Sequence, residues 1–125
     1  MPLRWEILHP EKLVLVTGDG DVTLVDVEGY LDAIVTAGAM PYGKLFDATN
    51  VVPKYGDHDV MMLGARISAY VDTLKGGALA FVSTNQPTRE IIERYLNLAN
   101  KAERPTAIFG AVDDAKTWLA AQRRD

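Results

Sequence analysis

The chain contains 125 residues, of which 48% are hydrophobic and 24% are charged, values typical of a single globular domain spanning residues 1–125. It has no cysteine and two histidines. Disulfides, thiolate nucleophiles, cysteine-containing metal sites and sites built on three histidines are therefore excluded. The formal net charge of −4 opposes binding to nucleic acid or to an anionic membrane surface, so we expect neither partner.

No stretch of the sequence reaches the roughly 20 consecutive apolar residues that a membrane-spanning helix needs. Arg4 and Glu6 interrupt the first apolar stretch, which a secretory signal peptide would keep continuous. We therefore expect a cytoplasmic protein without a transmembrane segment.

The first half of the chain predicts a hairpin followed by a helix. Residues 3–7 alternate apolar and charged side chains, which predicts a strand with one wet face. Residues 13–17 are almost continuously apolar, which is typical of a strand covered on both faces and paired antiparallel with the first. Residues 18–21, Gly-Asp-Gly-Asp, predict a turn. Apolar side chains then recur at helical spacing from Leu24 to Val35.

Local signals mark the ends of this helix and of the next strand. Thr23 and Asp26 have the spacing of a capping box, and Gly38 is placed to be the left-handed residue that ends the helix. Residues 44–49 predict the third strand, and residues 50–56 predict an irregular connection.

The second half of the chain alternates helices with short apolar strands. Apolar side chains at helical spacing predict a helix that begins at Asp57 and continues to Leu74. The remaining predicted elements are a strand at 78–82, a helix with Pro87 in its first turn, a strand at 106–109 and a helix that Asp113 begins. The order β-β-α-β-α-β-α-β-α predicts a single-domain α/β fold with a mostly parallel sheet and an antiparallel edge hairpin.

Three segments carry a resemblance that supports this order. They are Lys44-Leu45-Phe46-Asp47, Asp57-His58-Asp59 at a helix start, and Ala111-Val112-Asp113-Asp114-Ala115 before Trp118-Leu119. With the element order, they make the chain similar to the STAS superfamily, and more narrowly to its SpoIIAA-like branch of anti-sigma-factor antagonists. That branch also includes domains similar to SEC14 lipid-binding modules.

The resemblance has one implication for regulation. In regulatory members of the family, the helix after the third strand begins with Asp followed by a Ser that a partner kinase phosphorylates. Asp57 matches that Asp, and His58 or Asp59 stands where the Ser would be. The resemblance therefore implies a regulatory binding module without the usual serine phospho-switch.

Asp57, His58 and Asp59 form the densest polar cluster in the chain. At a helix N-terminus, carboxylates stabilise the helix through its exposed N–H groups and its dipole. Alternatively, His58 takes part in binding a partner or a ligand, since histidine titrates near neutral pH. A metal site would need further histidine ligands, and His9 lies in a distant predicted turn. We predict no metal ion and no cofactor.

A second group of polar residues follows the predicted third and fourth strands. Ligands and partners bind at the carboxyl ends of parallel strands, which favours a binding surface there. The same residue types also serve as local caps, so hydrogen bonding to nearby backbone is the competing interpretation. The group comprises Asp47, Thr49, Asn50, Ser83, Thr84 and Asn85.

Three functions follow from these observations. The first is a non-catalytic regulatory or protein-interaction module, with a protein or a second copy of the chain as partner, since homodimers are common. The second is a carrier or sensor of a small apolar or lipid-like ligand. The third is an enzyme that uses Asp47, His58 and Asp59 as acid and base, although no nucleophile or cofactor motif accompanies them.

Two adjacent methionines add one further expectation. Met61 and Met62 cannot both lie on one narrow apolar stripe of a helix. Methionine commonly fills irregular gaps in protein cores, so we expect core filling here.

Overall fold

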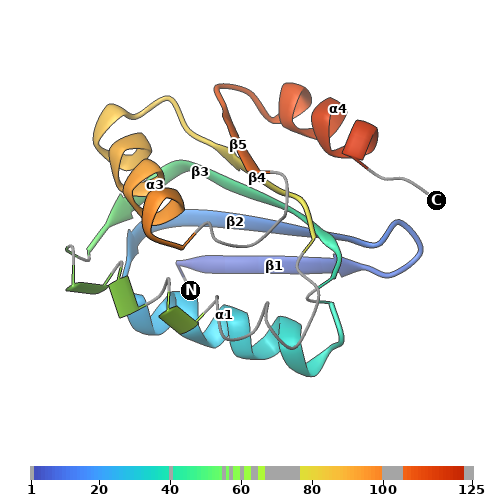
Figure 1. The fold of residues 1–125 in the computed structure, drawn as a ribbon, viewed down its shortest axis with the longest axis horizontal. Helices are drawn as coiled ribbons and strands as arrows, with labels where there is room; N and C mark the ends of the chain where they lie inside the picture. The colour runs from blue at the N-terminus through green and yellow to red at the C-terminus, as the bar shows by residue number, and fades with distance from the viewer. Residues whose placement is uncertain are drawn as a thin grey trace.

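The computed structural model describes residues 2–39, 41–54, 56, 58–59, 61–62, 65–66, 77–99 and 106–122. The elements shown in Figure 1 are, in order, β1 (Leu3–Leu8), β2 (Leu13–Val22), α1 (Leu24–Thr36), β3 (Gly43–Pro53), β4 (Leu79–Val82), α3 (Gln86–Ala99), β5 (Thr106–Phe109) and α4 (Val112–Gln122). Between β3 and β4, residues 58–59, 61–62 and 65–66 are helical. The described elements follow the predicted α/β order.

The strands form one five-stranded sheet in the order β1-β2-β3-β4-β5. β1 pairs antiparallel with β2, whereas β2, β3, β4 and β5 are parallel to one another. Figure 1 shows β1 as the outermost strand of the described sheet, lying alongside α1. The prediction of a mostly parallel sheet with an antiparallel edge hairpin is confirmed.

β2 and β3 are both longer than the sequence predicted. Residues 19–22 of β2 pair with residues 50–53 of β3, after a register shift between Thr17 and Asp19. The predictions of a turn at 18–21 and of an irregular connection beginning at Asn50 were therefore wrong. The reason is that pairing with a neighbouring strand outweighs the turn preference of Gly and Asp, and a bulge absorbs the irregular step.

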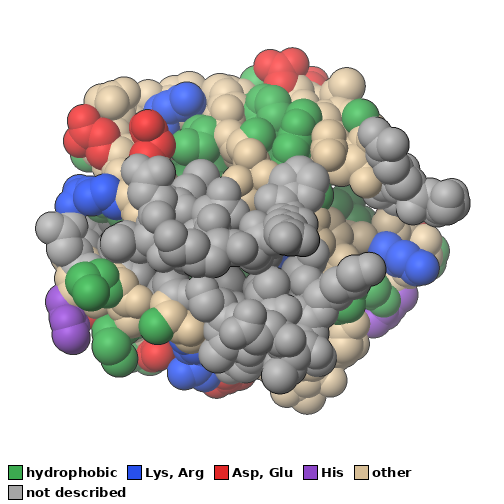
Figure 2. All heavy atoms as spheres, in the orientation of Figure 1, with side chains coloured by type: hydrophobic (Ala, Val, Ile, Leu, Met, Phe, Trp, Pro, Cys, Tyr) green, Lys and Arg blue, Asp and Glu red, His purple; other side chains and the backbone are tan. Residues whose placement is uncertain are grey.

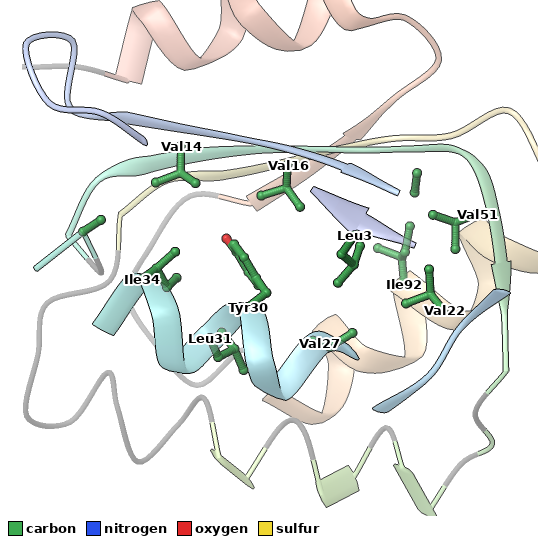
Figure 3. Close-up of a cluster of buried hydrophobic side chains, with 12 residues drawn as sticks. Leu3, Val14, Val16, Val22, Val27, Tyr30, Leu31, Ile34, Val51 and Ile92 are labelled. Atoms are coloured by element: carbon green, nitrogen blue, oxygen red, sulfur yellow. The ribbon is translucent and has the colours of Figure 1, made fainter. Parts of the chain in front are cut away.

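The first face of the sheet carries the larger hydrophobic cluster, which α1 and α3 cover (Figure 3). Strand residues Val14 and Val16 are almost fully buried there and point toward Ile34 and Tyr30 of α1. Ile92 joins the same cluster from α3. Burial of this apolar face, at about 25 cal/mol per Å² of apolar surface, is the main stabilising contribution on this side.

The second face of the sheet packs against α4 alone among the described helices. Ala115 and Leu119 of α4 contact Leu45 of β3 and Ala80 and Val82 of β4. β2 contributes to both faces, because Val14 and Val16 join the first cluster while Leu13 and Leu15 pack against the second. This confirms the prediction of a second strand that is apolar on both faces.

The helix boundaries agree closely with their sequence signals. Asp26 accepts a hydrogen bond from the Thr23 N–H at 2.9 Å, and the Thr23 hydroxyl accepts one from the Asp26 N–H at 3.4 Å. This is the predicted capping box, and Gly38 after the helix has a positive φ of 72°. α4 begins at Val112, one residue before the predicted Asp113. None of the helices that the structure describes is long and apolar enough to cross a membrane.

Candidate functional site

The carboxyl ends of β4 and β5 lie level with Asp47, which is in the middle of β3. Asp47 is in register with Val82, and Val82 is in register with Phe109. Ser83 and Thr84 directly follow Val82, the last residue of β4, so they lie just past the end of the strand next to Asp47. Asp47, Ser83 and Thr84 therefore lie near one another across β3 and β4.

Thr49 and Asn50 are placed differently from the prediction. Both lie within β3, which continues past the end of β4, and both are exposed. Asn50 is in register with Asp19 of β2 rather than with a residue of β4. Thr49 and Asn50 therefore lie inside the extended strand rather than at its carboxyl end.

The polar groups near this end of β4 mainly bond to nearby backbone. Ser83 is fully buried, and its hydroxyl accepts a hydrogen bond from the Asn85 N–H at 3.2 Å. A carboxylate oxygen of Asp47 accepts one from the Thr49 N–H at 3.0 Å. Both are local bonds to the backbone two residues ahead, which supports the interpretation that these side chains shape the nearby backbone.

The start of α3 is held by Asn85, which was predicted together with Ser83 and Thr84, and by Thr88 and Arg89, which were not predicted as site residues. The Asn85 side-chain oxygen accepts from the Thr88 N–H at 3.1 Å, which makes Asn85 the helix cap. Thr88 is buried, and its hydroxyl lies 3.5 Å from the Val51 carbonyl oxygen. Arg89 donates to the Ser83 carbonyl at 2.9 Å. The three-residue spacing from Asn85 to Thr88 is the signal that could have identified this cap.

His58 and Asp59, from the predicted polar cluster, lie in the helical residues that follow β3. Asp57 lies outside the described residues. His58 is exposed and makes no hydrogen bond to another described residue. Asp59 is half-buried, and its carboxylate accepts a hydrogen bond from the Gly56 N–H at 3.2 Å. A carboxylate that bonds to a backbone N–H three residues earlier is half of a capping box, so Asp59 stabilises the start of this helix.

Large apolar side chains are exposed on the stretch of chain that runs from the end of β3 through the helical residues after His58. The exposed fractions are 46% for Val52, 58% for Met61 and 53% for Met62. The expected core filling by the two methionines was therefore wrong. Hereafter, the His58 surface denotes Val52, His58, Asp59, Met61 and Met62. Figure 2 shows hydrophobic side chains beside a histidine at one end of the molecule, and the second histidine at the opposite end.

Ion pairs attach the helical residues that follow this surface to α1. Arg66 contacts Asp32 at 2.6 Å and Glu28 at 3.4 Å, and these two carboxylates lie four residues apart on α1. Residues at that spacing lie on the same side of a helix, so one guanidinium reaches both. α1 therefore helps to fix the position of this segment relative to the sheet.

The three residues of the enzyme hypothesis have separate surroundings in the structure. Asp47 bonds to the Thr49 N–H and Asp59 to the Gly56 N–H, while His58 is exposed. Within the described residues, no hydrogen bond joins any two of the three. The same part of the chain contains no group of three His, Asp or Glu side chains that could hold a metal ion.

Comparison with solved structures identifies the class of fold. An uncharacterised DUF3478-family protein with a SpoIIAA-like fold from Shewanella loihica superposes with a TM-score of 0.62 at 16% identity, covering 94% of this chain and 93% of the other. An anti-sigma factor antagonist from Mycobacterium paratuberculosis gives a TM-score of 0.57 at 18% identity, covering 94% of each chain.

The anti-sigma factor antagonist SpoIIAA in its unphosphorylated form gives a TM-score of 0.61 at 10% identity, covering 97% of this chain and 99% of the other. No model of a protein family matches the chain, and no curated protein matches it significantly. The chain therefore has a SpoIIAA-like fold, which confirms the resemblance found in its sequence.

Proposed function

We propose that this protein is a non-catalytic, cytoplasmic regulatory module that binds a protein partner through the His58 surface. The observation that carries the proposal is the exposure of Met61 and Met62 just after a polar helix start, with Val52 exposed shortly before it in the chain. Exposed apolar side chains rimmed by polar groups are typical of interaction surfaces, and methionine adapts its shape to a partner.

The positions of these residues suit a binding surface. Asp59 holds the helix start through Gly56, and Arg66 attaches the following residues to α1. The apolar side chains are therefore presented on a supported segment, which lowers the entropy that binding must overcome. His58 and Asp59 carry no hydroxyl, so we propose that serine phosphorylation at this position does not control binding.

The comparisons support the same class of function. Two of the structures with this fold are anti-sigma factor antagonists. A fold does not by itself establish a function, so the proposal depends on the surface of this chain.

A ligand carrier is the alternative that the described residues favour less. A groove with a volume of about 250 Å³ lies between the start of β1 and α1, lined by Pro2, Leu3, Trp5, Val25, Asp26 and Gly29. Sites for small molecules usually enclose about 300–1,000 Å³. The groove is smaller than that range, and it belongs to a different region from the His58 surface.

The proposal can be tested by affinity capture from the source organism. The bait carries either the natural sequence or the paired change Met61→Asp and Met62→Asp. We expect the natural chain to retain a stoichiometric protein partner and the variant to lose it. With the purified partner, the variant should bind at least about tenfold more weakly, since two desolvated apolar contacts are replaced by charges.

The control is Ala120→Asp, which introduces a charge on the exposed side of α4. It should retain the partner, and circular dichroism should show that both variants are folded. Equal capture by the natural chain and the methionine variant would reject the His58 surface. A small molecule found by native mass spectrometry in the natural chain, with no protein partner, would instead support the carrier.

A further inference from the structure

β1 is an edge strand, since β2 is the only strand that pairs with it in the described sheet. The Asp19 N–H donates to the Pro2 carbonyl at 2.8 Å, and these residues are opposite one another in the β1–β2 register. In an antiparallel ladder, hydrogen-bonded and non-hydrogen-bonded pairs alternate. The backbone groups of residues 2, 4, 6 and 8 therefore point toward β2, and those of Leu3, Trp5 and Ile7 point outward.

These outward groups can pair with one more strand. Leu3, Trp5 and Ile7 each provide an N–H and a C=O, because none of them is proline. An antiparallel copy of β1 centred on Trp5 places Trp5 opposite the partner's Trp5 and Leu3 opposite the partner's Ile7. That alignment uses all six outward groups on each strand.

The charges on β1 select the same alignment. The side chains of Arg4 and Glu6 are exposed, and they project from the face of β1 opposite to the side chains of Leu3, Trp5 and Ile7. With Trp5 at the centre, Arg4 lies opposite the partner's Glu6, and Glu6 lies opposite the partner's Arg4. A shift of two residues in register, in either direction, places Arg4 opposite the partner's Arg4 or Glu6 opposite the partner's Glu6. Opposite charges across a strand pair attract and like charges repel, so only the centred alignment satisfies both pairs.

The alternation of side chains also restricts the alignment. A shift by one residue would place the outward-pointing groups of Leu3, Trp5 and Ile7 opposite residues whose groups face β2, and the ladder could not form. Beside β1, on the side of the sheet that α1 covers, a groove exposes apolar side chains. Val25, which is 74% exposed, lines this groove together with Trp5. An exposed apolar groove beside an open edge strand is typical of a surface that another polypeptide chain binds and covers.

We propose that the occupant of this edge is a second copy of the chain. Two β1 strands pair antiparallel about Trp5, and the two five-stranded sheets become one continuous sheet across a two-fold axis. The charge pattern is what favours a second copy over an unrelated strand, because Arg4 and Glu6 are complementary to their own two-fold copies. This proposal does not depend on the His58 surface.

Sedimentation of the purified full chain over a concentration series tests the proposal. We expect a dimer of twice the 13.7 kDa chain mass. Glu6→Arg and Arg4→Glu each replace two attractive pairs by two repulsive ones, so each should raise the dimer dissociation constant by roughly tenfold or more. The double variant, with Arg4→Glu and Glu6→Arg, exchanges the charges and should restore the natural dissociation constant.

Glu11→Arg is the matched control, since it makes the same charge change in the exposed hairpin turn outside β1, and it should leave the dimer unchanged. Hydrogen exchange should show protection of the Leu3, Trp5 and Ile7 amides that increases with protein concentration. A chain that stays monomeric throughout the series would overturn the proposal. So would a dimer that the single variants leave unchanged, or one that the double variant fails to restore.

Discussion

At the scale of single residues, Gly18 determines how β2 and β3 fit together. It lies at the register shift between Thr17 and Asp19, where a Cβ would collide with Cγ2 of Val51. Gly18→Ala should therefore destabilise the protein by about 1–3 kcal/mol, because an added methyl group overpacks the contact. Urea denaturation followed by circular dichroism measures the change in the free energy of unfolding.

Val51→Ala provides the control for this prediction, since it removes the atom with which the new Cβ would collide. In the Val51→Ala background, the added cost of Gly18→Ala should be at least about 0.5 kcal/mol smaller than in the natural chain. Equal costs in the two backgrounds would show that the collision is not the cause.

Residue types alone do not indicate which polar side chains at the site bind and which support the fold. Asp59 and Asp47 were predicted as site residues by type, and the structure shows each bonded to a backbone N–H. The exposure of Met61 and Met62 could not be predicted either. Two adjacent apolar residues on a helix are compatible with burial or exposure, and the packing of the rest of the chain decides between them.

At the scale of elements, the start of α3 depends on the Asn85 cap. The Asn85 side chain satisfies the Thr88 N–H, one of the donors that a helix N-terminus leaves without an intrahelical partner. Asn85→Ala should reduce the free energy of unfolding by about 1 kcal/mol, the usual cost of losing such a cap. Thermal and urea denaturation measure this loss.

Asn85→Asp is the conservative control, because a carboxylate accepts the same hydrogen bond and also interacts favourably with the helix dipole. Its stability should stay within about 0.5 kcal/mol of the natural chain. A loss of similar size in both variants would assign the effect to something other than capping.

Element order was predictable from the sequence, whereas some strand lengths were not. Alternation of apolar runs with helical spacing identifies each described strand and helix, because those patterns follow from the geometry of one element. The extra length of β2 and β3 arises from pairing between residues 19–22 and 50–53, which are distant in the sequence. Local turn preferences contain no information about that pairing. The turn predicted at 18–21 and the irregular connection predicted from Asn50 were therefore wrong.

At the scale of the whole molecule, the single sheet joins two hydrophobic clusters. The larger cluster lies under α1 and α3, and the smaller lies under α4. Adjacent residues of β2 alternate between the two clusters, so this strand couples the packing on the two faces of the sheet. The domain should therefore unfold as one cooperative unit.

The two tryptophans allow this cooperativity to be measured, because each reports on one cluster. Trp5 packs against the larger cluster, with its ring 5.6 Å from that of Tyr30. Trp118 packs against the smaller cluster, 5.7 Å from the ring of Phe109. In the single-tryptophan variants Trp5→Phe and Trp118→Phe, fluorescence and circular dichroism should give coincident urea transitions for each protein.

A destabilising change on one face of the sheet should then shift the urea unfolding transition that the tryptophan on the other face reports. Leu119→Ala removes a buried side chain of α4 and should cost about 2–5 kcal/mol. In the Trp118→Phe background, the fluorescence of Trp5 on the opposite face should report that full cost, because the sheet between the two clusters couples them. If Leu119→Ala leaves the unfolding transition reported by Trp5 fluorescence unchanged, the face under α4 unfolds on its own.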